Sequence, residues 1–203
     1  MSNSLKKIVI ATKNKGKAAE IKKLFEPAGV KVCSLLDFAN LELPPETGTT
    51  FAANATAKAR YAAEKTGYAC LADDSGLEVD YLSGAPGVYS ARYAGPDATD
   101  EDNWRKLLAA LSGVPADKRG ARFVCVVAFV ELAGFNATVH TFDGVLEGTI
   151  AASPSGPNGF GYDPVFFIPC LQKTVAQLSL DEKNGISHRG QALKKFKAWF
   201  EGR

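Results

Sequence analysis

The chain has 203 residues, of which 46% are hydrophobic and 23% charged, which is typical of a globular protein with a substantial core. Its net charge of +2 is too small to indicate nucleic-acid binding, and no apolar run approaches the roughly 20 residues of a membrane-spanning helix. The N-terminus lacks a signal-peptide profile. The four cysteines form no C-x-x-C pair, so we expect reduced core thiols in a cytoplasmic protein, without disulfides or a zinc site.

The first predicted element is a short β-branched strand over residues 6–11, and a second strand is expected over residues 30–33. Between them, the basic segment Thr12-Lys-Asn-Lys-Gly-Lys17 precedes a helix that ends near Phe25. A helix N-terminus offers free N–H groups to an anion, and the lysines add positive charge. The segment is not a Walker A loop, because the first Gly and the final Ser or Thr are missing. A phosphate site and a solvated lysine-rich loop both remain open.

A strong helix is predicted over residues 51–65, with Thr49 or Thr50 as its N-cap. The segment is rich in alanine and carries apolar residues at helical spacing. Asn54 and Lys58 lie four positions apart and therefore one turn from each other. The simplest interpretation is that both are exposed polar side chains on another face of the helix.

The stretch Asp73-Asp74-Ser75-Gly76 follows the apolar residues 68–72, so we predict a strand that ends in a turn. Two adjacent carboxylates repel each other, but Mg²⁺ bound beside a phosphate takes one or two carboxylates as ligands. A magnesium site and an ordinary surface turn are both consistent with these four residues. Glu46, in the loop before the predicted helix, is either a loop carboxylate or a further metal ligand.

The second half of the chain continues the alternation of strands and helices. We expect a strand over 77–81 and a structured loop over 84–95. A helix is expected to begin at a Thr99–Asp102 capping box and to end at Leu111. A strand over 122–132, buried on both faces, is expected to form a hairpin with residues 138–147. This alternation predicts an α/β fold with a mixed central β-sheet flanked by helices. No linker or repeat divides residues 1–203, so we expect a single domain.

Two later motifs carry further polar and aromatic residues. Gly159-Phe-Gly-Tyr-Asp163 places glycines beside Phe160, which suits either a flat ligand or an aromatic loop packed on the core. Ser187-His-Arg-Gly190 opens a final helix that runs to about Phe200. A single His188 is more often structural, but the neighbouring Arg189 at a helix start favours an anion or base contact.

Five motifs, in this order, resemble those of the inosine triphosphate pyrophosphatase (Ham1-like) family in its bacterial form. They are Thr12–Lys17, Glu46-Thr-Gly48, Asp73–Gly76 with Gly84–Arg92, Gly159–Pro164 and Ser187–Gly190, and the likeness spans nearly the whole chain. One difference is that Lys13 and Lys15 stand where many relatives carry a smaller or neutral residue.

The resemblance implies a two-lobed fold with a substrate cleft between the lobes, a homodimer, and a Mg²⁺-dependent hydrolysis of ITP, dITP and XTP to the monophosphate and pyrophosphate. It implies that Asp74 accepts the proton and contacts the metal, with Glu46 as a metal ligand and Asp73 in support. The implied substrate-binding residues are Thr12, Lys13, Asn14, Lys15, Gly16, Lys17, Ser75, Phe160, Gly161, Tyr162, Asp163, Lys183, His188 and Arg189.

The chemistry of these residues fits such a reaction. Lysines and Mg²⁺ neutralise phosphate charge, and an aspartate can take the proton of an attacking water. A donor from Lys183 or Arg189 would distinguish a 6-oxo purine from adenine, whose 6-amino group is itself a donor. A nucleotide-binding sensor without hydrolysis, and a broader nucleoside triphosphate pyrophosphatase, are the alternatives.

Overall fold

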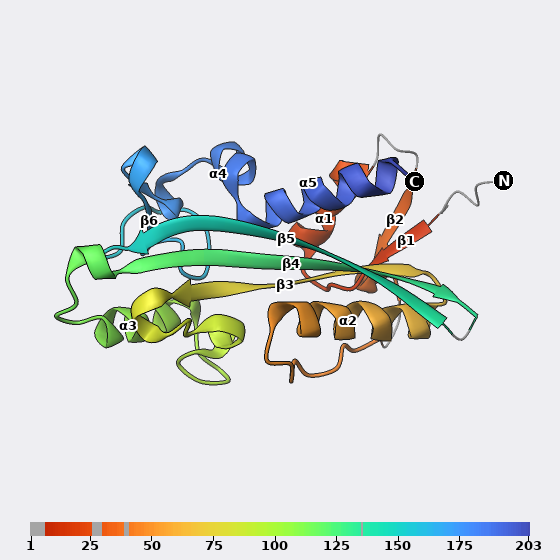
Figure 1. The fold of residues 1–203 in the computed structure, drawn as a ribbon, viewed down its shortest axis with the longest axis horizontal. Coiled ribbons are helices and arrows are strands. Elements are labelled where there is room, and N and C mark those ends of the chain that lie inside the picture. Colours follow the sequence, from red (N-terminus) through yellow and green to blue (C-terminus); the bar gives the residue numbers. More distant parts are fainter. Residues whose placement is uncertain (1–6, 26–29, 39–40, 135) are drawn as a thin grey trace. The chain divides into compact units, whose positions relative to one another are not determined.

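The structure is a computed structural model of the 203-residue chain, and it describes all residues except 1–6, 26–29, 39–40 and 135. Seven strands form one sheet in the order β2-β1-β3-β4-β5-β6-β7 (Figure 1). The strands are β1 Lys7–Ile10, β2 Lys31–Ser34, β3 Ala69–Val79, β4 Gly120–Ala133, β5 Asn136–Ile150, β6 Phe166–Ile168 and β7 Lys173–Thr174. β1 pairs in parallel with β2 and β3, whereas β6 pairs antiparallel with β5 and β7, so the predicted mixed sheet is confirmed.

The α-helices flank the sheet, and short 3₁₀ turns connect several elements. The α-helices are α1 Lys15–Phe25, α2 Phe51–Thr66, α3 Asp100–Ala110, α4 Leu180–Ile186 and α5 His188–Glu201. The 3₁₀ segments are Leu35–Asp37, Asp80–Leu82, Gly87–Arg92, Ala116–Lys118, Pro169–Leu171 and Val175–Gln177. None of the helices in the described part of the chain is long and apolar enough to cross a membrane.

The chain divides into two compact units, neither of which is continuous in sequence. Unit 1 comprises residues 1–74, 126–143 and 192–203, and unit 2 comprises 75–125 and 144–191. The boundaries fall inside β3, β4, β5 and α5, so each of these three strands and this helix contributes residues to both units.

Unit 1 has a core on each face of its strands. On one face, alanines of α2, such as Ala55 and Ala59, pack with apolar residues of β1, β3 and β4. On the other face, Phe129 of β4 contacts Phe196 of α5, and Phe196 contacts Phe25 of α1, with ring centroids 5.1 and 5.2 Å apart. Figure 1 shows the corresponding layers, with α2 on one side of these strands and α1 and α5 on the other.

Unit 2 has its own core, formed by side chains of β3, α3, β4 and the segment around β6. The buried residues include Leu77, Leu107, Phe123, Val165 and Phe166. Phe123 and Phe166 stack with their ring centroids 4.3 Å apart. Each unit therefore buries apolar side chains of its own, which fixes the backbone that carries the polar groups described below.

β3 differs from its prediction at the two adjacent aspartates, Asp73 and Asp74. Instead of ending before Asp73, it runs unbroken through Asp73-Asp74-Ser75-Gly76 to Val79. The turn prediction was wrong because turn-forming residues were taken as a strand end, whereas β3 has hydrogen-bonded neighbours, β1 and β4, that hold it extended. Both aspartates are consequently buried.

Three smaller predictions also need correction. α4 was not predicted, although Ser179 and Glu182 form a capping box at its start. β4 is buried on both faces only at residues 127–130, since buried and partly exposed residues alternate before them. All four cysteines are free, but Cys170 is exposed at the surface rather than in the core, and Cys33 is only partly buried.

Candidate active site

A cluster of charged side chains in unit 1 surrounds Asp74 of β3. Its Oδ2 accepts a hydrogen bond from Asn54 Nδ2 at 3.0 Å, and its Oδ1 lies 3.4 Å from Lys58 Nζ. Lys58 Nζ also donates to Glu46 Oε1 at 2.6 Å. The lysine thus links a carboxylate from the loop before α2 to one from the middle of the sheet.

The position of Asn54 and Lys58 follows from the spacing of buried residues along α2. Residues 51, 54, 55, 58, 59, 62 and 63 of this helix are buried, which is a single helical stripe. Asn54 and Lys58 therefore lie on the face of α2 that packs against the sheet, and the prediction that they are exposed was wrong. The helix begins at Thr50, whose side chain accepts from Ala53 N at 3.1 Å.

Gly48 fixes the loop that carries Glu46 against this helix. Its N–H donates to Asn54 Oδ1 at 2.8 Å, so Asn54 bridges the loop and Asp74. A Cβ at position 48 would lie only 2.6 Å from Asn54 Oδ1. The close approach of backbone to Asn54 therefore requires glycine here.

Burial dominates the electrostatics of Asp74. It raises the pKa of the Asp74 carboxyl above its ordinary value, and Glu46 adds to the rise, whereas Lys58 and Asn54 act in the opposite direction. Burial also lowers the pKa of Lys58, but the negative charges of Asp74 and Glu46 outweigh it, and the net shift is upward. Lys58 thus stays protonated beside a carboxylate that takes up a proton more readily than an exposed aspartate.

One lysine of the basic segment Thr12–Lys17 forms an ion pair with an aspartate of β3 next to Asp74. Lys17 Nζ pairs with Asp73 Oδ2 at 2.9 Å, whereas Lys13 pairs with Glu42 in the loop before α2. Asn14 caps α1, because its Oδ1 accepts from Lys17 N at 3.1 Å. Part of the hydrogen-bonding capacity of this helix N-terminus is therefore used by the chain itself.

The remaining residues of the segment are placed as follows. Thr12 is buried, and its Oγ1 accepts from Asn14 N at 3.1 Å. Lys15 and Gly16 belong to the first turn of α1 rather than to the predicted loop, and the side chain of Lys15 lies outside what the structure describes.

The donor chemistry of the cluster fits a magnesium ion, although its geometry shows no preformed metal cage. In the described part of the chain, no group of three or more His, Cys, Asp and Glu side chains is placed to hold a metal, so Glu46, Asp73 and Asp74 do not form one. Mg²⁺ commonly takes only one or two carboxylates together with phosphate oxygens. The cluster joins three carboxylates to two lysines, which leaves an excess of negative charge for a cation to balance.

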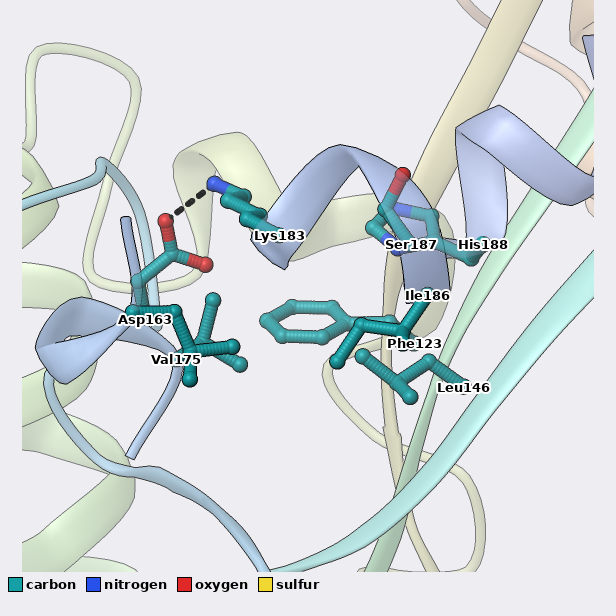
Figure 2. A pocket seen from close by; sticks show the side chains of 9 residues that line it. Phe123, Leu146, Asp163, Val175, Lys183, Ile186, Ser187 and His188 are labelled. Atoms are coloured by element: carbon teal, nitrogen blue, oxygen red, sulfur yellow. Dashed lines mark hydrogen bonds and ion pairs between the residues drawn. The ribbon is translucent and has the colours of Figure 1, made fainter. Parts of the chain in front are cut away.

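Unit 2 contains a small pocket that is partly open to solvent. Figure 2 shows Asp163 and Lys183 pointing toward each other on one side of it, where they form an ion pair. His188 stacks on Phe123 with the ring centroids 5.0 Å apart. The lining residues are Phe123, Leu146, Asp163, Val175, Leu178, Lys183, Ile186, Ser187 and His188.

The loop of Phe160 and Gly161 lies beside Asp163. Phe160 N donates to Asp163 Oδ2 at 2.9 Å, and Lys183 Nζ lies 4.3 Å from the centre of the Phe160 ring. The ring itself is 60% exposed, so a flat ligand can reach it. Gly159 has a left-handed backbone (φ +84°), and a Cβ there would lie 2.2 Å from Asp163 Oδ2, so only glycine fits.

The structure gives different surroundings to the other predicted residues of unit 2. Arg189 is buried, and its Nη2 donates to Ser75 Oγ at 3.3 Å. Tyr162 is also buried, and its hydroxyl donates to the Ser90 carbonyl at 2.8 Å, so its side chain belongs to the core. Ser187 caps α5, because its Oγ accepts a hydrogen bond from Gly190 N at 3.1 Å. The substrate contacts assigned to these residues remain predictions.

Sequence reasoning missed three residues that the structure brings into these two groups. Asn54 and Lys58 could have been found, because both fall on the helical stripe marked by Phe51, Ala55, Ala59 and Ala62. Phe123 gave no signal, since it resembles any other apolar residue of the strand β4.

Together, the fold and the site define a mixed α/β protein with a lysine-linked carboxylate cluster in one unit and an aromatic, charged pocket in the other. The model of the Ham1 family matches residues 8–199. A dITP/XTP pyrophosphatase of Yersinia pseudotuberculosis is 52% identical over 94% of this chain and 95% of its own, and one of Exiguobacterium is 53% identical over 95% of each. A solved HAM1 protein from Coxiella burnetii is 44% identical, with a TM-score of 0.91 over 97% of this chain and 99% of its own. This chain therefore belongs to the Ham1 family.

Proposed function

We propose that this protein hydrolyses the non-standard purine nucleoside triphosphates dITP, ITP and XTP at the α–β phosphate bond, releasing the monophosphate and pyrophosphate. One observation carries the proposal: a buried Asp74 holds Asn54 on one oxygen and Lys58 on the other, in a chain that is 52% identical to a dITP/XTP pyrophosphatase. Such hydrolysis removes these nucleotides from the precursor pool.

Asp74 is the proposed proton acceptor. Asn54 fixes the orientation of its carboxylate, and a carboxylate held in this way can take the proton of an attacking water. The ammonium group of Lys58 contacts both Asp74 and Glu46. Lys58 therefore helps to position the Asp74 carboxylate while keeping its own proton.

The phosphates are assigned to the cluster of unit 1, with Lys17 and the N-terminus of α1 as their positive partners. Because the cluster already has more carboxylates than lysines, a triphosphate needs a further cation, and Mg²⁺ is proposed as the cofactor, with Glu46 and Asp74 as its ligands. When bound, Mg²⁺ supplies neutralisation of phosphate charge and orientation of the attacked phosphorus.

The purine base is assigned to unit 2. The exposed ring of Phe160 offers a stacking surface, and Lys183 and Arg189 are donors suited to a 6-oxo group. Adenine would leave such a donor unpaired, because its 6-amino group cannot accept. His188 and Asp163 line the same pocket as Lys183.

The decisive assay measures pyrophosphate release from ITP, XTP, dGTP and dTTP, with and without Mg²⁺. We expect fast release from ITP and XTP, slow release from the other two, and no turnover without the metal. Equal rates on all four substrates would refute purine selectivity, and a product of single phosphate would refute cleavage at the α–β bond.

Replacing Asp74 by Asn tests the role of the carboxylate. We expect kcat for ITP to fall at least about 100-fold, since a positioned general base contributes about that much or more, while ITP binding measured by calorimetry is retained. Asp143→Asn is the matched control, because Asp143 is exposed and pairs only with Lys195 among the contacts described. Asp73→Asn separates the two aspartates: a larger loss of kcat there than in Asp74→Asn would transfer the role to Asp73.

A homodimer and a cytoplasmic location are further parts of the proposal; the first rests on the family resemblance, and the second on the cysteine pattern of the sequence. Light scattering of the purified protein tests the first, with a monomer mass as the contradicting result. Fractionation of the source cells tests the second, with activity outside the cytoplasmic fraction as the contradicting result.

A further inference from the structure

The loop from Phe160 to Asp163 is held by several hydrogen bonds besides the Asp163–Lys183 ion pair, and the acidic side chain that binds Gly161 lies outside every motif of the sequence. Phe160 N donates to the Asp163 carboxylate, the Tyr162 hydroxyl to the Ser90 carbonyl, and Ala176 N to the Asp163 carbonyl. A further contact runs from Gly161 N to Asp100 Oδ2 at 2.7 Å. Asp100 belongs to the first turn of α3, 61 residues away in sequence.

The Phe160 ring needs such anchors because, apart from the Lys183 ammonium group 4.3 Å from its centre, little packing holds it. The side chain is 60% exposed, and Gly159 and Gly161 on either side both have left-handed backbones, with φ of +84° and +61°. Glycines leave a segment conformationally free, so its geometry depends on hydrogen bonds to its N–H groups. Two carboxylates supply them, Asp163 at Phe160 and Asp100 at Gly161.

α3 is a rigid support for this contact. Its N-terminus carries a complete Thr99–Asp102 capping box, and Leu107 is fully buried in the unit 2 core. Asn103, one turn after Asp100, accepts from Ala94 N at 2.8 Å and donates to the Ala91 carbonyl at 3.2 Å. The start of α3 therefore fixes the loop near Tyr93 as well as the loop of Phe160.

We infer that Asp100 is a positioning residue for base recognition: it fixes Gly161 and thereby sets the plane of the Phe160 ring on which the purine stacks. This rests on the proposed function. The simpler role of Asp100 is to stabilise the positive end of the α3 dipole, as any acidic residue of a first turn does. Glu101 shares that role, but in the structure it pairs with Arg105 on the exposed surface of α3.

Three variants separate the two roles: Asp100→Ala removes the acceptor, Asp100→Asn keeps an acceptor oxygen but removes the charge, and Glu101→Ala is the matched control. In Asp100→Ala we expect KM for ITP to rise about three- to tenfold, as for one lost hydrogen bond, while kcat changes less than twofold. Asp100→Asn should recover most of the wild-type KM, and Glu101→Ala should leave KM unchanged. The melting temperature is measured for all three, because a dipole effect would lower it equally in Asp100→Ala and Glu101→Ala.

A second measurement does not depend on activity. Hydrogen exchange of the Gly161 amide, followed by NMR, should accelerate in Asp100→Ala and stay near the wild-type rate in Asp100→Asn and Glu101→Ala. An unchanged KM in Asp100→Ala, or an Asp100→Asn variant as impaired as Asp100→Ala, would overturn the positioning role. If the wild-type protein does not hydrolyse ITP, the proposed function is overturned. The exchange measurement still tests the contact in that case, because an unchanged exchange rate of the Gly161 amide in Asp100→Ala would show that Asp100 does not hold Gly161.

Discussion

At the scale of single residues, the site depends on polar side chains that are buried and therefore must have partners. Asp74 and Lys58 are both less than 10% exposed, and each has its polar atoms engaged by the other and by Asn54 or Glu46. A buried charge is tolerated only when a partner and hydrogen bonds compensate for lost hydration. If one of these side chains is replaced, the buried polar groups that it contacts lose a partner.

Lys58→Met tests this dependence. We expect the free energy of unfolding to fall by about 3 kcal/mol, because two carboxylates are left near each other without their shared cation. Lys195→Met, which breaks an exposed ion pair with Asp143, should cost less than about 1 kcal/mol. Urea denaturation measures both. Millimolar Mg²⁺ should recover part of the loss in Lys58→Met, and an equal effect of Mg²⁺ on the two variants would contradict a metal site at these carboxylates.

Cys70 provides a test that involves pH. Burial raises the pKa of its thiol to about 11, from an ordinary value of 9.0. Above pH 9 the unfolded chain therefore loses this proton while the folded chain keeps it, and the folded state loses stability as pH rises toward 11. We expect wild type to lose about 2 to 3 kcal/mol more than Cys70→Ala between pH 8 and 11. Parallel stability curves for the two proteins would show that the thiol is not shielded as the structure indicates.

At the scale of elements, α2 is the support of the proposed catalytic cluster. It delivers Asn54 and Lys58 from one face, and the same face carries the alanines that allow its close approach to the sheet. Gly48 and Thr50 determine where the helix begins, and so where Asn54 lies relative to Asp74. The start of the helix is thus coupled to the geometry of the cluster.

Thr50→Ala should destabilise the protein by about 1 kcal/mol, the usual cost of a lost N-cap. Thr49→Ala is the control, since Thr49 is exposed and the cap contact is made by its neighbour. Thermal unfolding followed by circular dichroism compares the two. If Thr49→Ala were the more destabilising change, the helix would begin one residue earlier than the structure shows.

At the scale of the whole molecule, the chain passes between the two units within three strands and the helix α5 rather than through linkers. β3 leaves unit 1 between Asp74 and Ser75, and β4 and β5 are divided between the units in the same manner. If one unit unfolds, the other loses the continuation of three strands and of α5. We therefore expect the chain to unfold as one cooperative system.

The two tryptophans allow this to be measured, because Trp104 lies in unit 2 and Trp199 in unit 1. Trp104→Phe and Trp199→Phe each leave one fluorophore that reports on one unit. Within each variant, we expect the fluorescence transition in urea to coincide with the loss of far-ultraviolet circular dichroism, which reports on both units. A fluorescence midpoint that departs clearly from the circular dichroism midpoint would show that the units unfold separately.

The sequence by itself determined the fold class, most helices and strands, and the family, because these depend on local periodicity, capping residues and motifs. α1, α2 and α3 lie close to where their apolar spacing placed them, and the Thr99–Asp102 capping box is present. These features are encoded within a few neighbouring residues, so no knowledge of distant contacts was needed.

Only the tertiary structure decided which polar residues are buried and what they contact. Asp73 and Asp74 lie within a continuous strand because hydrogen-bonded neighbours on both sides, β1 and β4, come from distant parts of the chain. Lys58 meets Glu46 and Asp74, and Asp100 meets Gly161, across 12, 16 and 61 residues respectively. Contacts of this kind leave no local pattern, since their energy is gained only when the two segments have already been brought together by the fold.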